Sequence, residues 1–208
     1  MMTNLVLKIP RPVRFLLILL LIVLAVFFAW RFFVYAPKIV PPPFLEARKE
    51  GALISQTIVG LTEDSNQRLK LIGTLESVSD YDQALRLVLK NLESNNEIRE
   101  RAFDLSRRLE TMAGAISAIE PKEAQFKAQE AIAAELSLIS KLISYNQLLS
   151  QLLEVLRVKI IAGTNGGQLE GAGEITALVG RINEEIAVIN GLNRKFNETM
   201  GEFDSYFQ

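Results

Sequence analysis

The chain has 208 residues, with no cysteine, no histidine, and 23 basic against 24 acidic side chains. The missing cysteines exclude disulfides, thiolate nucleophiles and iron–sulfur clusters, and the missing histidines exclude Ser-His-Asp triads, HExxH zinc sites and His-ligated haem. We therefore expect a non-enzymatic protein with no metal and no cofactor, and the charge balance argues against a nucleic-acid partner.

The first 36 residues are apolar and basic, with no acidic side chain before Glu46. Residues 1–14 form a basic flank, and residues 15–36, about 33 Å long as a helix, predict a transmembrane helix in contact with the lipid bilayer. The alternative is a cleaved signal peptide, but the apolar stretch exceeds the usual 7–15 residues or so and lacks a small-x-small cleavage site. The basic flank favours a single-pass membrane localisation with a cytoplasmic N-terminus and an extracytoplasmic remainder.

Residues 37–43 hold four prolines and predict a stiff spacer. Beyond it, apolar residues recur at alternating steps of three and four, which is typical of amphipathic helices in a bundle. We predict helices over residues 44–78, 80–119, 121–162 and 174–207, with a glycine-rich loop over 163–173. The expected fold is all-α: one N-terminal transmembrane helix, followed over residues 44–208 by an elongated antiparallel four-helix bundle with up-down-up-down topology.

Short polar motifs indicate where these helices begin and end. Ser79 resembles an N-cap, and Glu120-Pro121 predicts a break because proline suits the first turn of a new helix. Ser94 and Glu97 also fit a capping box, which leaves open whether the second bundle helix is continuous through Ser94–Asn96 or divided there.

When the four predicted helices are folded back at these turns, five polar residues lie at a similar level along the bundle axis. They are Ser65, Asn95, Tyr145, Asn146 and Asn193. They predict a polar belt across an otherwise apolar core. Buried amides can fix the register of packed helices, the residues can instead turn outward or cap a break, or they can line a ligand-binding pocket.

A transmembrane helix followed by an elongated helical bundle is similar in outline to LemA-type proteins and to the sensor bundles of bacterial chemoreceptors. This likeness is one of architecture, and no functional residue is carried over from it. We expect a membrane-anchored helical interaction or scaffold module with a protein partner or self-association. The alternative is a sensor or small-ligand-binding bundle that uses the polar belt. An exposed apolar stripe would favour the former, and a cavity lined by the amides the latter.

Overall fold

The computed structural model describes residues 22–24, 26, 38–164 and 172–208. The chain divides into two units, Met1–Lys38 and Ile39–Gln208. In the first unit, residues 22–24 and 26 are helical. The rest of the predicted membrane segment 15–36, with its expected lipid contact, and the basic flank 1–14 lie outside the described residues, as does most of the predicted glycine-rich loop.

The predicted membrane localisation requires correction. Within the described ranges, no helix is both long and apolar enough to cross a membrane. This finding contradicts the single-pass assignment, together with the cytoplasmic N-terminus and extracytoplasmic bundle that depended on it. A spanning helix needs about 20 predominantly apolar residues. The long helices described below instead carry exposed charged side chains along one face, which interrupts every such stretch.

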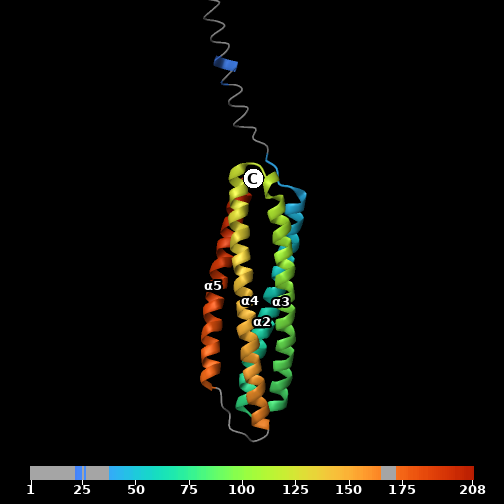
Figure 1. Ribbon diagram of the computed structural model, residues 1–208, viewed down its shortest axis with the longest axis vertical. Coiled ribbons are helices and arrows are strands. Elements are labelled where there is room, and N and C mark those ends of the chain that lie inside the picture. The colour runs from blue at the N-terminus through green and yellow to red at the C-terminus, as the bar shows by residue number, and fades with distance from the viewer. Residues whose placement is uncertain (1–21, 25, 27–37, 165–171) are drawn as a thin grey trace, which may run out of the picture. The chain divides into compact units, whose positions relative to one another are not determined.

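The second unit is all-α, as predicted. It consists of α2 (Pro42–Ser77), α3 (Tyr81–Ala115), a short 3₁₀ helix η1 (Ile116–Ala118), α4 (Lys122–Thr164) and α5 (Ala172–Ser205). No strand occurs among the described residues, and Ile39 and Glu120 form one isolated antiparallel bridge. Figure 1 shows the four long helices side by side, with successive helices running in opposite directions. The prediction of a helical bundle is therefore confirmed.

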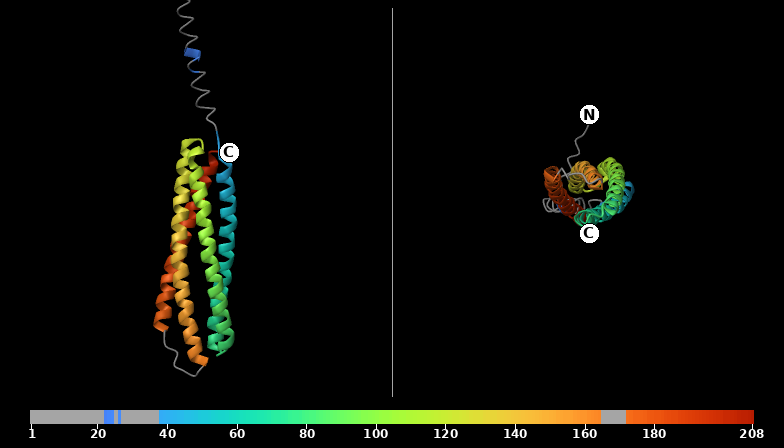
Figure 2. Two further views of the ribbon diagram at one scale, coloured as in Figure 1. Left: turned by 45° about the vertical axis from the view of Figure 1, so that its right-hand side comes forward. Right: turned by 90° about the horizontal axis from the view of Figure 1, so that it is seen from below.

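The helices pack in chain order around the bundle. α2 packs on α3, α3 on α4, and α4 on α5, whereas α2 and α5 make few close backbone approaches. Figure 2 shows this arrangement along the bundle and from below. Leucine, isoleucine and alanine side chains at helical spacing on α3 and α4 form the centre of the core. By contrast, α5 buries only five of its 34 residues, namely Leu178, Ile182, Thr199, Met200 and Phe203.

The turn between α2 and α3 explains how the first helix ends. Ser79 has a φ of 60°, and the amides of Ser79 and Asp80 donate to the carbonyls of Glu76 (3.1 Å) and Leu75 (2.9 Å). This pattern is a Schellman motif, in which a residue in the left-handed region closes the helix. The cap of α3 is therefore Asp80, whose carboxylate accepts from the amide of Gln83 (3.2 Å), and not Ser79 as the sequence suggested.

Other helix ends also differ from the sequence interpretation: α3, for example, ends at Ala115 where residue 119 was predicted. α2 begins at Pro42 with Pro41 as its cap, so the end of the expected proline spacer forms the first turn of the helix. α3 runs unbroken through Ser94–Asn96, which settles the question left open by the possible capping box. The chain does break before α4, where Glu120-Pro121 is a cis peptide.

Side chains join α2 to α5 at one end of the bundle. Arg48 donates two hydrogen bonds to Asp204, with N–O distances of 2.6 and 2.8 Å. Beside this pair, the ring of Phe203 lies 5.3 Å from that of Phe44 and 5.0 Å from that of Phe207, measured between centroids. Arg48 also lies over the Phe203 ring. Farther along the bundle, the space between α2 and α5 is open enough to form a groove.

Candidate functional site: a groove between α2 and α5

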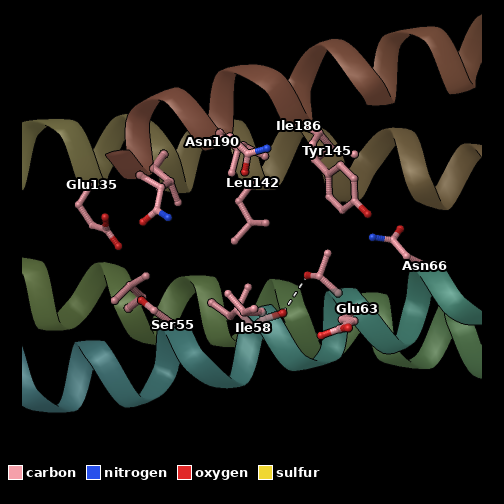
Figure 3. Close-up of a pocket in the computed structure, with 15 residues that line it drawn as sticks. Ser55, Ile58, Glu63, Asn66, Glu135, Leu142, Tyr145, Ile186 and Asn190 are labelled. Carbon is pink, nitrogen blue, oxygen red and sulfur yellow. Dashed lines mark hydrogen bonds between the residues drawn. The ribbon is translucent and has the colours of Figure 1, made fainter. Parts of the chain in front are cut away.

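The groove has a volume of about 370 Å³ and draws its lining from all four long helices. α4 forms its floor through Glu135, Leu138, Leu142 and Tyr145. Its walls come from α2 (Ser55, Ile58, Val59, Thr62, Glu63, Asn66) and α5 (Ile186, Ile189, Asn190, Asn193), with Leu105 from α3. Figure 3 shows these side chains pointing into the space between α2 and the α4–α5 pair. Most of the lining surface is apolar, as in small-molecule sites, although polar and charged side chains make up about half of the lining residues.

Glu135 is the buried acid of this groove. Its relative exposure is 5%, and its Oε2 atom has no hydrogen-bond partner. Because removal from water penalises the charged form, burial raises the pKa of Glu135 from its ordinary value of 4.5 to about 7. An unpaired carboxyl held in this way is costly to the fold and is characteristic of functional sites.

Tyr145 provides the second unpartnered polar group. It is 2% exposed, and its hydroxyl has no hydrogen-bond partner within the protein. Burial raises the pKa of this phenol, so the hydroxyl remains a neutral donor near pH 7. In Figure 3 the hydroxyl points toward Asn66 on α2. A buried tyrosine hydroxyl usually finds a partner, and here a ligand in the groove can supply one.

The five residues of the predicted belt do not meet in one place. Ser65 lies in the α2–α3 interface, where its carbonyl accepts from the side-chain amide of Asn91 (3.1 Å). Asn91 in turn accepts from Arg68 Nε (2.6 Å), and Arg68 also donates to Ser94 (2.8 Å). These groups bind one another across two helices, so Ser65 belongs to a structural contact outside the groove.

Asn95 and Asn146 lie in the α3–α4 interface. The side-chain amide of Asn95 donates to the Asn146 carbonyl (2.8 Å) and to Ser150 Oγ (2.7 Å), while that of Asn146 donates to the carbonyl of Leu142 (2.9 Å). Both side chains are buried and line a separate, more polar hollow of about 270 Å³. Their donor groups are bound within the protein, which fits the interpretation that they fix helix register, whereas the Oδ1 atoms of both residues have no partner there.

Tyr145 and Asn193 are therefore the predicted residues that the structure brings to the groove. Asn193 is exposed at its edge, where its Oδ1 accepts a weak hydrogen bond from Asn197 (3.3 Å). Sequence reasoning missed Glu135. The sequence nevertheless indicates that Glu135 faces inward. Ala131 and Leu138 occupy inward positions of the same predicted helix, and residue 135 lies four after the first and three before the second, on the same face.

Another hollow, of about 320 Å³, adjoins the groove toward the Arg48–Asp204 end and shares Ser55, Leu105, Glu135 and Asn193 with it. Glu135 thus stands where the two spaces meet. In the described part of the chain, the groove included, no group of three or more acidic side chains is arranged to hold a metal ion. The chemistry available in the groove is hydrogen bonding, charge and apolar contact.

Comparisons with known proteins identify no relative of this chain: no family model matches it, nor does any curated protein or any solved structure. The function of the groove is therefore inferred from its own residues.

Proposed function

We propose that this chain is a non-enzymatic, ligand-binding helical bundle that takes a small, largely apolar molecule into the groove between α2 and α5. One observation carries the proposal: Glu135 and Tyr145, both more than nine-tenths buried, line the same 370 Å³ space, and each has a polar atom without a hydrogen-bond partner in the protein. Unsatisfied buried polar groups destabilise a protein, so their presence together in one groove favours a ligand that satisfies them.

The sequence favoured a protein-interaction module, but this function has weaker support than ligand binding. Large apolar side chains are exposed on all four long helices, among them Leu53, Phe103, Phe126 and Val188. Exposed apolar residues distributed singly are ordinary on protein surfaces and mark no particular face. The ligand-binding alternative, in contrast, has a defined location and a defined set of polar groups.

Blocking the groove tests the proposal. Ser55 is half-buried on its α2 wall, and Ser55→Phe fills the space, whereas Thr57→Phe adds the same ring to the exposed side of α2. Compounds that raise the melting temperature of the wild-type protein in a screen of small amphipathic molecules should bind the Ser55→Phe variant at least tenfold more weakly. The Thr57→Phe variant should retain wild-type affinity, as measured by titration calorimetry.

Tyr145→Phe gives a second, gentler measure of the same proposal. The ring packs as before and only the hydroxyl is lost, so affinity should fall by about 1 kcal/mol, roughly fivefold, for ligands that accept its hydrogen bond. Equal affinity for the wild-type, Ser55→Phe and Tyr145→Phe proteins would contradict binding in the groove, as would a screen without any stabilising compound.

A further inference from the structure

The charges around the groove are all of one sign. Among the residues that line it, Glu63 and Glu135 are acidic and none is basic. Glu63 is exposed at the rim on α2, and Glu135 is buried on the floor. The lining from α3 is Leu105, and that from α5 consists of two isoleucines and two asparagines, so neither helix contributes a charge.

Arg48 is the one basic residue among those that line the adjoining hollow. Its guanidinium is bound by both oxygens of Asp204, at 2.6 and 2.8 Å, which leaves Glu135 without a protein cation. The raised pKa of Glu135 agrees with this geometry, because an opposite charge nearby would lower the pKa. A bound cation would supply the missing charge and return the carboxyl to its ionised form.

The remaining groups along the floor suit the body of such a ligand. Leu138 and Leu142 separate Glu135 from Tyr145, a distance of ten residues or about 15 Å along the helix. An apolar chain or ring can lie on these leucines while its charged end meets Glu135. The ring of Tyr145 adds an aromatic surface at the other end of the groove.

We propose that the groove selects an organic cation: an amine with an apolar body, whose ammonium group binds the Glu135 carboxylate while its body lies over Leu138 and Leu142 toward Tyr145. This inference rests on the proposed ligand-binding function and narrows it to one class of ligand. An uncharged ligand that accepts a hydrogen bond from protonated Glu135 is the competing possibility, and an anion is disfavoured by both carboxyl groups.

Three matched probes separate these possibilities: 4-phenylbutylamine, 4-phenylbutanol and 4-phenylbutanoate, which share an apolar body and differ in charge. The amine should bind the wild-type protein at pH 8 at least tenfold more tightly than the alcohol, and the carboxylate should bind most weakly. Glu135→Gln keeps the size of the side chain and removes its charge, so it should abolish the preference for the amine. Glu198→Gln, at an exposed position of α5 outside the groove, should change it by no more than about twofold.

A measurement on the wild-type protein alone makes the test independent of any variant. Because burial raises the pKa of Glu135 to about 7, a large share of these side chains is protonated at pH 6.5, so binding the amine should release a measurable fraction of one proton and binding the alcohol none. Calorimetry in two buffers with different ionisation enthalpies measures this number.

Equal binding of amine and alcohol, or amine binding without proton release, would overturn the cation inference and leave the ligand-binding groove intact. Failure of all three probes to bind at millimolar concentration would also overturn it. The proposed function itself is judged separately, by the amphipathic screen with the Ser55→Phe variant.

Discussion

At the scale of single residues, the buried carboxyl of Glu135 is an electrostatic cost to the bundle. The carboxyl is removed from water without a hydrogen bond to its Oε2 atom and without a cation beside it. A leucine or methionine at this position would pack against Leu105 and Leu138 without that cost. The sequence therefore retains a group that opposes folding at neutral pH, which is the pattern expected when stability is exchanged for binding.

The cost of Glu135 should appear as a pH dependence of stability. Its pKa is about 7 in the folded protein and 4.5 when exposed, so the folded state binds the extra proton between these values. Stability is therefore unaffected by this group below pH 4.5, falls as the pH rises toward 7, and remains reduced above it. The full reduction corresponds to about 3 kcal/mol.

Glu135→Gln removes this ionisation and tests the sign. The difference in free energy of unfolding between variant and wild type should be near zero at pH 4 and grow to about 2–3 kcal/mol in favour of the variant at pH 8, measured by urea denaturation. Glu63→Gln is the matched control at an exposed position and should stay within about 0.5 kcal/mol of wild type throughout. A flat difference between pH 4 and pH 8 would mean that Glu135 ionises freely.

At the scale of helices, polar contacts bind α2 to α3 along the side of the bundle away from the groove. Asn91 is fully buried and uses both ends of its amide, accepting from Arg68 and donating to the Ser65 carbonyl. Arg68 extends the contact to Ser94 on the next turn of α3. Because these donors and acceptors match at one alignment only, they fix the register of the two helices.

Asn91→Leu should therefore destabilise the protein although leucine is apolar and similar in size. The change removes the acceptor of Arg68 Nε and the hydrogen bond that Asn91 donates to the Ser65 carbonyl, at a cost of about 2–4 kcal/mol in the free energy of unfolding. Asn96→Leu, five residues along α3 and exposed, should cost less than about 0.5 kcal/mol. Equal stability of the two variants would show that Arg68 and Ser65 find water instead.

Helix positions were accessible to sequence reasoning because they depend on local signals. Apolar spacing, Glu120-Pro121 and the glycines after residue 162 placed the four bundle helices close to their observed bounds. The site was harder to predict from the sequence, because it depends on which helix faces pack against one another. Asn95 and Tyr145 were predicted at the same level along the bundle axis, but they line different hollows. The groove beside Tyr145 exists because α2 and α5 do not pack closely there.

At the scale of the whole bundle, α5 has the fewest buried residues of the four long helices. It lies against α4, and its contacts with α2 gather at the end where Phe203 packs against Phe44 and Asp204 binds Arg48. Along the groove, the α5 residues that face α2 are partly or fully exposed. We expect α5 to be the first helix to open in the absence of a ligand, because local stability follows buried apolar contact.

Phe203→Ala tests how far that end contact holds the groove together. Removing a ring that is 1% exposed should cost about 3–5 kcal/mol, and the loss should fall first on α5. Hydrogen exchange should then accelerate throughout Ala172–Ser205 while α3 and α4 remain protected. Val188→Ala, on the same helix but 43% exposed, should leave exchange nearly unchanged. Uniform acceleration in all four helices would instead mean that the bundle opens as one cooperative unit, with α5 no weaker than the rest.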